Sequence, residues 1–121
     1  MAIQYFSEDI VLVRLPLSEP QISNELKKVN DFIGNEGNFD VIVDFSKAEM
    51  VISSSLTNLM ILRQFLDEIG RRLVLCDVSL FVKNIFSIVG LEALFDFADD
   101  KFAALESLRS AKSHSQSCLA D

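Results

Sequence analysis

The chain has 121 residues, of which 50% are hydrophobic and 10 are phenylalanine, so it suits one domain whose core needs no disulfide staples. The formal net charge of −7 disfavours direct binding to DNA or RNA, because an acidic surface repels phosphates. No run approaches the ~20 apolar residues of a membrane span, so we expect a soluble protein without one.

The two cysteines differ in their surroundings and do not suggest a disulfide. Cys76 lies in an apolar run, whereas Cys118 lies in a polar tail. The first residues do not resemble a secretory signal. These features predict a protein of the reducing cytoplasm.

The beginning of the chain predicts two strands and a helix. Apolar residues favour a short edge strand from Ile3 to Phe6 and a second strand over Ile10–Leu15. Ser18 and Gln21 resemble a capping box that opens the helix. Gly34 is the expected stop, because glycine adopts a left-handed conformation without penalty.

The rest of the chain continues this alternation of strands and helices. Val41–Phe45 is apolar on both faces, as a buried strand is, and a long helix that ends at Gly70 follows it. The remaining predicted elements are a strand over 72–78, a helix from Ser79 to Gly90, a short strand over 94–97, and a last helix capped by Asp99 or Asp100.

This order of elements predicts a single α/β domain with a largely parallel sheet over residues 1–109. From residue 110 the composition turns to Ser, Lys, His and Gln without apolar periodicity. We therefore expect residues 110–121 to form a flexible C-terminal tail.

Three consecutive serines, Ser53, Ser54 and Ser55, lie between the strand over 41–45 and the long helix. The first N–H groups of a helix lack intrahelical partners, and the helix dipole favours added negative charge. A serine in this place serves either as a helix cap or as a phosphate acceptor whose charge the helix tolerates. The spacing alone does not choose between these two roles.

The most specific stretch of the chain runs from residue 69 to 108 and reads IGRRLVLCDVSLFVKNIFSIVGLEALFDFADDKFAALESL. Together with Val41–Phe45 and the serine turn, it resembles the STAS domain family, named for sulfate transporters and anti-sigma factor antagonists. The resemblance covers residues 3–108. It implies a mixed, mostly parallel sheet of four to five strands with about four helices packed on one side.

Free-standing bacterial members of this family are anti-sigma factor antagonists, also called anti-anti-sigma factors. The resemblance implies a cytoplasmic regulator of transcription whose unphosphorylated form binds an anti-sigma factor, often a serine kinase. Phosphorylation at the start of the second long helix ends that binding, and a phosphatase restores it. We expect no cofactor: nucleotide binding has some precedent in the family, but no nucleotide-binding motif occurs in this sequence.

The phosphoacceptor turn of the family usually reads Asp-Ser-Ser/Thr-Gly-Leu-Gly, and residues 52–57 here read ISSSLT. By position Ser53 matches the acceptor, with Ser54 as second choice, and Leu56 matches the apolar anchor. Ile52 stands in place of the acid, and neither glycine is present, which narrows the backbone conformations of the turn. The implied partner-binding residues are Glu19, Ile52, Ser53, Ser54, Ser55, Leu56 and Thr57.

A catalytic or metal-binding function finds little support in the sequence. A serine nucleophile needs a base, and the only histidine, His114, lies in the tail without nearby metal ligands. No glycine-rich phosphate-binding motif occurs among the 4 glycines. We therefore expect neither an enzyme nor a metal site, and we interpret Cys76 as a buried apolar residue.

Two functions remain open at this point. The first is the antagonist that phosphorylation switches off. The second is a structural or accessory STAS module, never phosphorylated, in a signalling scaffold or a lipid-transport complex. Apolar residues from Leu56 to Met60 suit a partner interface or a homodimer equally well.

Overall fold

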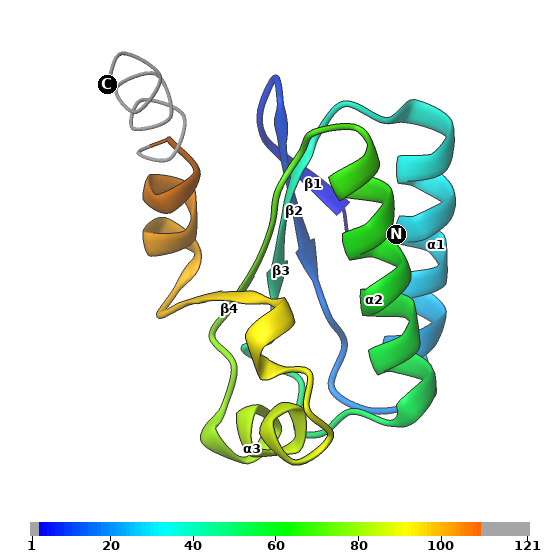
Figure 1. Ribbon diagram of the computed structural model, residues 1–121, viewed down its shortest axis with the longest axis vertical. Helices are drawn as coiled ribbons and strands as arrows, with labels where there is room; N and C mark the ends of the chain where they lie inside the picture. Colours follow the sequence, from blue (N-terminus) through cyan, green and yellow to red (C-terminus); the bar gives the residue numbers. More distant parts are fainter. Residues whose placement is uncertain (1–2, 110–121) are drawn as a thin grey trace.

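The computed structural model describes residues 3–109, and the predicted tail over 110–121 lies outside these residues. A five-stranded sheet with the order β1-β2-β3-β4-β5 forms the centre of the fold (Figure 1). β1 is antiparallel to β2, and the later strands continue parallel to β2. The strands are β1 (Ile3–Ser7), β2 (Ile10–Arg14), β3 (Asp40–Asp44), β4 (Leu73–Cys76) and β5 (Asp96–Ala98). The predicted mixed, mostly parallel sheet is confirmed.

Helices connect the parallel strands, and one more helix follows β5. They are α1 (Gln21–Glu36), α2 (Ser53–Glu68), α3 (Leu80–Ile88), the short 3-10 helix η1 (Glu92–Leu94) and a last helix over 101–109. Because β2 to β5 run in one direction, the loops that follow them lie along one edge of the sheet, and those after β2, β3 and β4 lie toward the lower part of Figure 1. No helix among residues 3–109 has the length and apolar character needed to cross a membrane.

The two faces of the sheet pack into two separate apolar clusters. α1, α2 and α3 cover one face, where Leu59 and Phe86 are fully buried. The helix over 101–109 covers the other face through Ala104 and Leu108. The expectation that the helices share one side is therefore wrong for this last helix, because strands of a parallel sheet are apolar on both faces and need cover on each.

Two helix caps agree with the sequence. Ser79 Oγ accepts a hydrogen bond from the N–H of Val82 at 3.2 Å, at the start of α3. Asp100 Oδ1 accepts from the N–H of Ala103 at 2.8 Å, at the start of the last helix. Both predicted caps are confirmed, with Asp100 rather than Asp99 in the second case.

The two ends of α1 differ from the prediction. The prediction of a capping box formed by Ser18 and Gln21 is wrong. Pro20 is the N-cap, and the carboxylate of Glu19 accepts a hydrogen bond from the N–H of Ser23. The helix also continues past Gly34, since a glycine inside a helix costs only about 1 kcal/mol. It ends at Glu36, and the next residue, Gly37, has a positive φ of 57°, which glycine adopts without penalty.

β4 is shorter than predicted, and β5 begins later in the sequence than predicted. β4 stops at Cys76, because Asp77 turns the chain with φ 55°. Glu92–Leu94 forms a 3-10 turn, so β5 begins only at Asp96.

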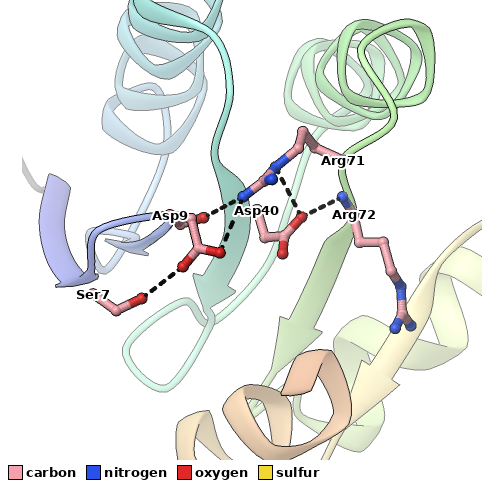
Figure 2. Close-up of polar contacts among 5 residues, drawn as sticks. All are labelled: Ser7, Asp9, Asp40, Arg71 and Arg72. Carbon is pink, nitrogen blue, oxygen red and sulfur yellow. Dashed lines mark hydrogen bonds and ion pairs between the residues drawn. The ribbon is translucent and has the colours of Figure 1, made fainter. Parts of the chain in front are cut away.

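The buried carboxylate of Asp40 and the side chain of Arg71 link β2, β3 and β4 near the residues where these strands begin (Figure 2). Arg71 Nη2 donates to the carbonyl oxygen of Asp9 at 2.7 Å, and Arg71 Nε lies 3.3 Å from Asp40 Oδ1. Asp40, only 3% exposed, also accepts the N–H of Arg72 at 2.9 Å. A charge at this depth needs a paired cation, which Arg71 supplies.

We predict that Arg71→Met lowers the free energy of unfolding by about 3 kcal/mol, because it leaves the Asp40 carboxylate buried without its cation. Arg72→Met is the matched control. Its ion pair with Asp96, at 3.1 Å, is exposed and is worth under about 1 kcal/mol, and its backbone N–H stays in place. Urea denaturation of both variants measures the difference, and equal midpoints would contradict this role of Arg71.

Candidate functional site

The three serines form the first turn of α2. The helix begins at Ser53, after Ile52, whose backbone is extended and whose side chain offers no capping atom. The N–H groups of Ser55 and Leu56 donate to the carbonyl oxygen of Ile52 at 3.0 and 3.1 Å. The N–H groups of Ser53 and Ser54 precede these first helical bonds, so they face the open end of the helix.

The carboxylate of Glu19 caps α2 from a different loop. Glu19 Oε2 accepts from the N–H of Ile52 at 3.1 Å and from Ser55 Oγ at 2.5 Å. Glu19 Oε1 accepts from the N–H of Ser23 at 3.0 Å, in the first turn of α1. One carboxylate therefore binds the N-termini of both helices, where the helix dipoles favour negative charge.

The three hydroxyls have different environments. Ser55 is 0% exposed, and its hydroxyl donates to Glu19. Ser53 and Ser54 are exposed, and within residues 3–109 neither hydroxyl has a hydrogen-bond partner. A kinase needs an accessible acceptor, so Ser53 and Ser54 suit that role by position, whereas Ser55 holds the turn in place.

The apolar residues from Leu56 to Met60, which were expected to suit a partner interface, expose less side-chain surface than expected. Leu56 is 8% exposed and Leu59 is fully buried, so both pack into the core. Thr57 and Met60 are exposed, with Met60 at 42%. The Leu56 side chain therefore anchors the helix rather than offering a contact to a partner or a second copy.

Exposed apolar side chains lie instead in the loops beside the serines. Leu17, Met50 and Ile52 are 55%, 46% and 38% exposed. Their loops lie side by side, since the N–H of Glu49 donates to the carbonyl oxygen of Leu17 at 3.2 Å. An exposed apolar group of this kind is typical of an interaction surface. We call these three residues, with Ser53 and Ser54, the serine-turn surface.

Polar contacts continue from Glu19 along the interface of α1 and α2. Asn58 Nδ2 donates to Ser23 Oγ at 3.2 Å, and Asn30 Nδ2 donates to the carbonyl oxygen of Asn58 at 3.1 Å. All three residues are buried. Sequence reasoning missed this row, although Ser23 and Asn30 lie seven residues apart and so share one helix face.

No protein-family model and no curated protein matches the sequence, but solved structures match the fold. A serine-to-glutamate variant of RsbS from Moorella thermoacetica has a TM-score of 0.78 at 17% identity, covering 92% of this chain and 96% of that one. An anti-sigma-factor antagonist (STAS) domain protein from Planctomyces limnophilus has a TM-score of 0.76 at 16% identity, covering 88% and 97%.

Two solved structures of the anti-sigma factor antagonist SpoIIAA, one of each phosphorylation state, are similar to this chain. Its unphosphorylated form has a TM-score of 0.74 at 18% identity, covering 89% of this chain and 95% of that one. Its phosphorylated form, from Bacillus, has a TM-score of 0.66 at 17% identity, covering 87% and 96%. The chain therefore has the fold of the STAS domain, as its sequence predicts.

We predict that Glu19→Ala lowers the free energy of unfolding by roughly 1 to 3 kcal/mol, because three donors in two helices lose their acceptor. Glu49→Ala in the neighbouring loop is the control, since its carboxylate is exposed and its effect should stay within about 0.5 kcal/mol. A double-mutant cycle with Ser55→Ala isolates the contact between Glu19 and Ser55. Strictly additive effects would exclude a coupling between these two side chains.

Proposed function

We propose that this protein is an anti-sigma factor antagonist that binds its anti-sigma factor, a serine kinase, through the serine-turn surface. The observation that carries the proposal is the accessible hydroxyl of Ser53 in the first turn of α2, beside exposed Leu17, Met50 and Ile52. The fold that this chain shares with SpoIIAA supports the same role. The existence of a phosphorylated form of SpoIIAA supports regulation by phosphate.

A phosphate on Ser53 is compatible with the fold. It adds a charge of about −1.5 to −2 at pH 7, at a helix end where the N–H groups of Ser53 and Ser54 precede the first helical bond. Helix N-termini of this kind accept anions readily. The same charge inside an apolar interface is costly, because it must be desolvated and it repels carboxylates of the partner. Phosphorylation therefore opposes binding and preserves folding.

The phosphate also acts on Glu19. That carboxylate already accepts the N–H of Ile52, directly before Ser53. Two negative groups at one helix end repel each other, so the phosphate weakens the contacts of Glu19 with Ile52 and Ser55. We expect phosphorylation of Ser53 to have two effects: it changes the charge of the serine-turn surface, and it shifts the loop over 45–52.

The test compares unmodified protein with protein that carries phosphoserine at position 53. The binding probe is the serine-kinase anti-sigma factor captured from the native host by the unmodified form. We expect the phosphoserine form to bind it about a hundredfold more weakly, which corresponds to about 2.8 kcal/mol. Incubation with this kinase and ATP, followed by mass mapping across residues 50–63, should locate the phosphate on Ser53.

Three controls make the outcome specific. Ser53→Ala should retain binding and lose the modification, protein with phosphoserine at position 54 tests the second-choice acceptor, and a phosphatase should restore the binding of the modified form. Equal binding of the two forms, or phosphate confined to Ser54, contradicts the proposed switch. A different stable partner without any phosphate would support the accessory scaffold module instead.

A further inference from the structure

Three side chains of metal-ligand type converge at the carboxyl ends of β3 and β4. Asp44 is the last residue of β3, Cys76 is the last residue of β4, and Asp77 follows it. Asp44 and Cys76 lie directly opposite each other in the parallel pair. One ligating atom from each of the three residues lies within 4.8 Å of the other two.

The Cys76 thiol is buried in this cluster without a partner. The residue is 0% exposed, and its Sγ lies within 4.8 Å of a carboxylate oxygen of both Asp44 and Asp77. Within residues 3–109 the sulfur takes part in no hydrogen bond or disulfide. Packing in the second apolar cluster accounts for the burial of Cys76, but it does not account for the two carboxylates beside the sulfur.

Asp44 holds its carboxylate in a fixed position. It is 6% exposed, and its Oδ1 accepts the N–H of Ser46 at 2.8 Å. Asp77 is partly exposed, which leaves the cluster open on one side. The cluster therefore combines a rigid oxygen ligand and a rigid sulfur ligand with one adjustable carboxylate.

Burial and neighbouring charges favour the protonated forms of Cys76 and Asp77. Burial, with the charges of Asp44 and Asp77, raises the pKa of the Cys76 thiol to about 12. Burial, followed by the charge of Asp44, also raises the pKa of Asp77. Lys101 opposes both effects, while Asp100 adds to them. A divalent cation would have to displace the thiol proton, and it would gain three ligating atoms that lie within 4.8 Å of one another.

We propose that Asp44, Cys76 and Asp77 bind a divalent cation of borderline softness, such as Zn²⁺. Zinc accepts thiolate and carboxylate ligands at about 2.3 and 2.0 to 2.2 Å, so tetrahedral ligands lie about 3.6 Å apart. The ligating atoms must therefore move closer together, chiefly through the partly exposed side chain of Asp77, and water fills the fourth position. Binding forms a metal–sulfur bond while the thiol proton passes to solvent. The site is independent of phosphorylation at Ser53.

The first measurement uses the full chain with Cys118→Ala, so that Cys76 is the sole thiol. We expect Co²⁺ to produce a thiolate-to-metal charge-transfer band in the near ultraviolet, and one equivalent of Zn²⁺ to remove it. Zn²⁺ should also raise the melting temperature, because it binds the folded chain. The absence of a charge-transfer band at excess Co²⁺ would overturn the proposal.

Variants separate this site from adventitious binding. Asp77→Asn changes a partly exposed side chain and should weaken Zn²⁺ binding by more than about tenfold, and Cys76→Ala should abolish the Co²⁺ band. Asp99→Asn is the matched control, an exposed acid near the same edge, and should leave both readouts unchanged. Zn²⁺ binding that Asp77→Asn does not weaken would show an adventitious ion only.

Discussion

The parallel pairing of β2, β3, β4 and β5 is the constraint on which the rest of the structure depends. Because these strands end at one edge, the loops that carry Glu19, Ser53 and Asp77 come together from distant parts of the chain. The opposite edge holds Arg71 and its carboxylate partners. Charges are thus paired at the edge where the strands begin, while hydroxyls, carboxylates and apolar side chains collect where they end.

Within that edge, α2 depends on a residue outside itself. Ile52 leaves the helix without a side-chain cap, and Glu19 replaces the cap through the N–H of Ile52 and the hydroxyl of Ser55. The same carboxylate caps α1. The Glu19 carboxylate therefore links the serine turn to the loop before α1. A charge added at Ser53 would affect the N-termini of both helices through this side chain.

Sequence reasoning succeeded where the signal is local. The alternation of strands and helices and the caps at Ser79 and Asp100 follow from neighbouring residues, and the resemblance to the STAS family predicted the sheet. The face covered by the last helix was missed, because an apolar stripe does not specify which side of a sheet it meets. The contact of Glu19 with Ser55 and the cluster around Cys76 were missed because each joins residues from different elements, with no motif spacing.

The serine triplet shows that the role of a hydroxyl depends on its depth in the fold rather than on its neighbours in the sequence. Ser55 is buried and bonded to Glu19, so a phosphate there would have to break the contact that joins α1 and α2. Ser53 and Ser54 are exposed, and no contact of their hydroxyls holds the turn. A group that the fold does not need can change its charge without unfolding the domain. Under the proposed function, a phosphate on Ser53 would act on Glu19 and on the partner that binds the neighbouring apolar side chains, which is the separation of folding from binding that a switch requires.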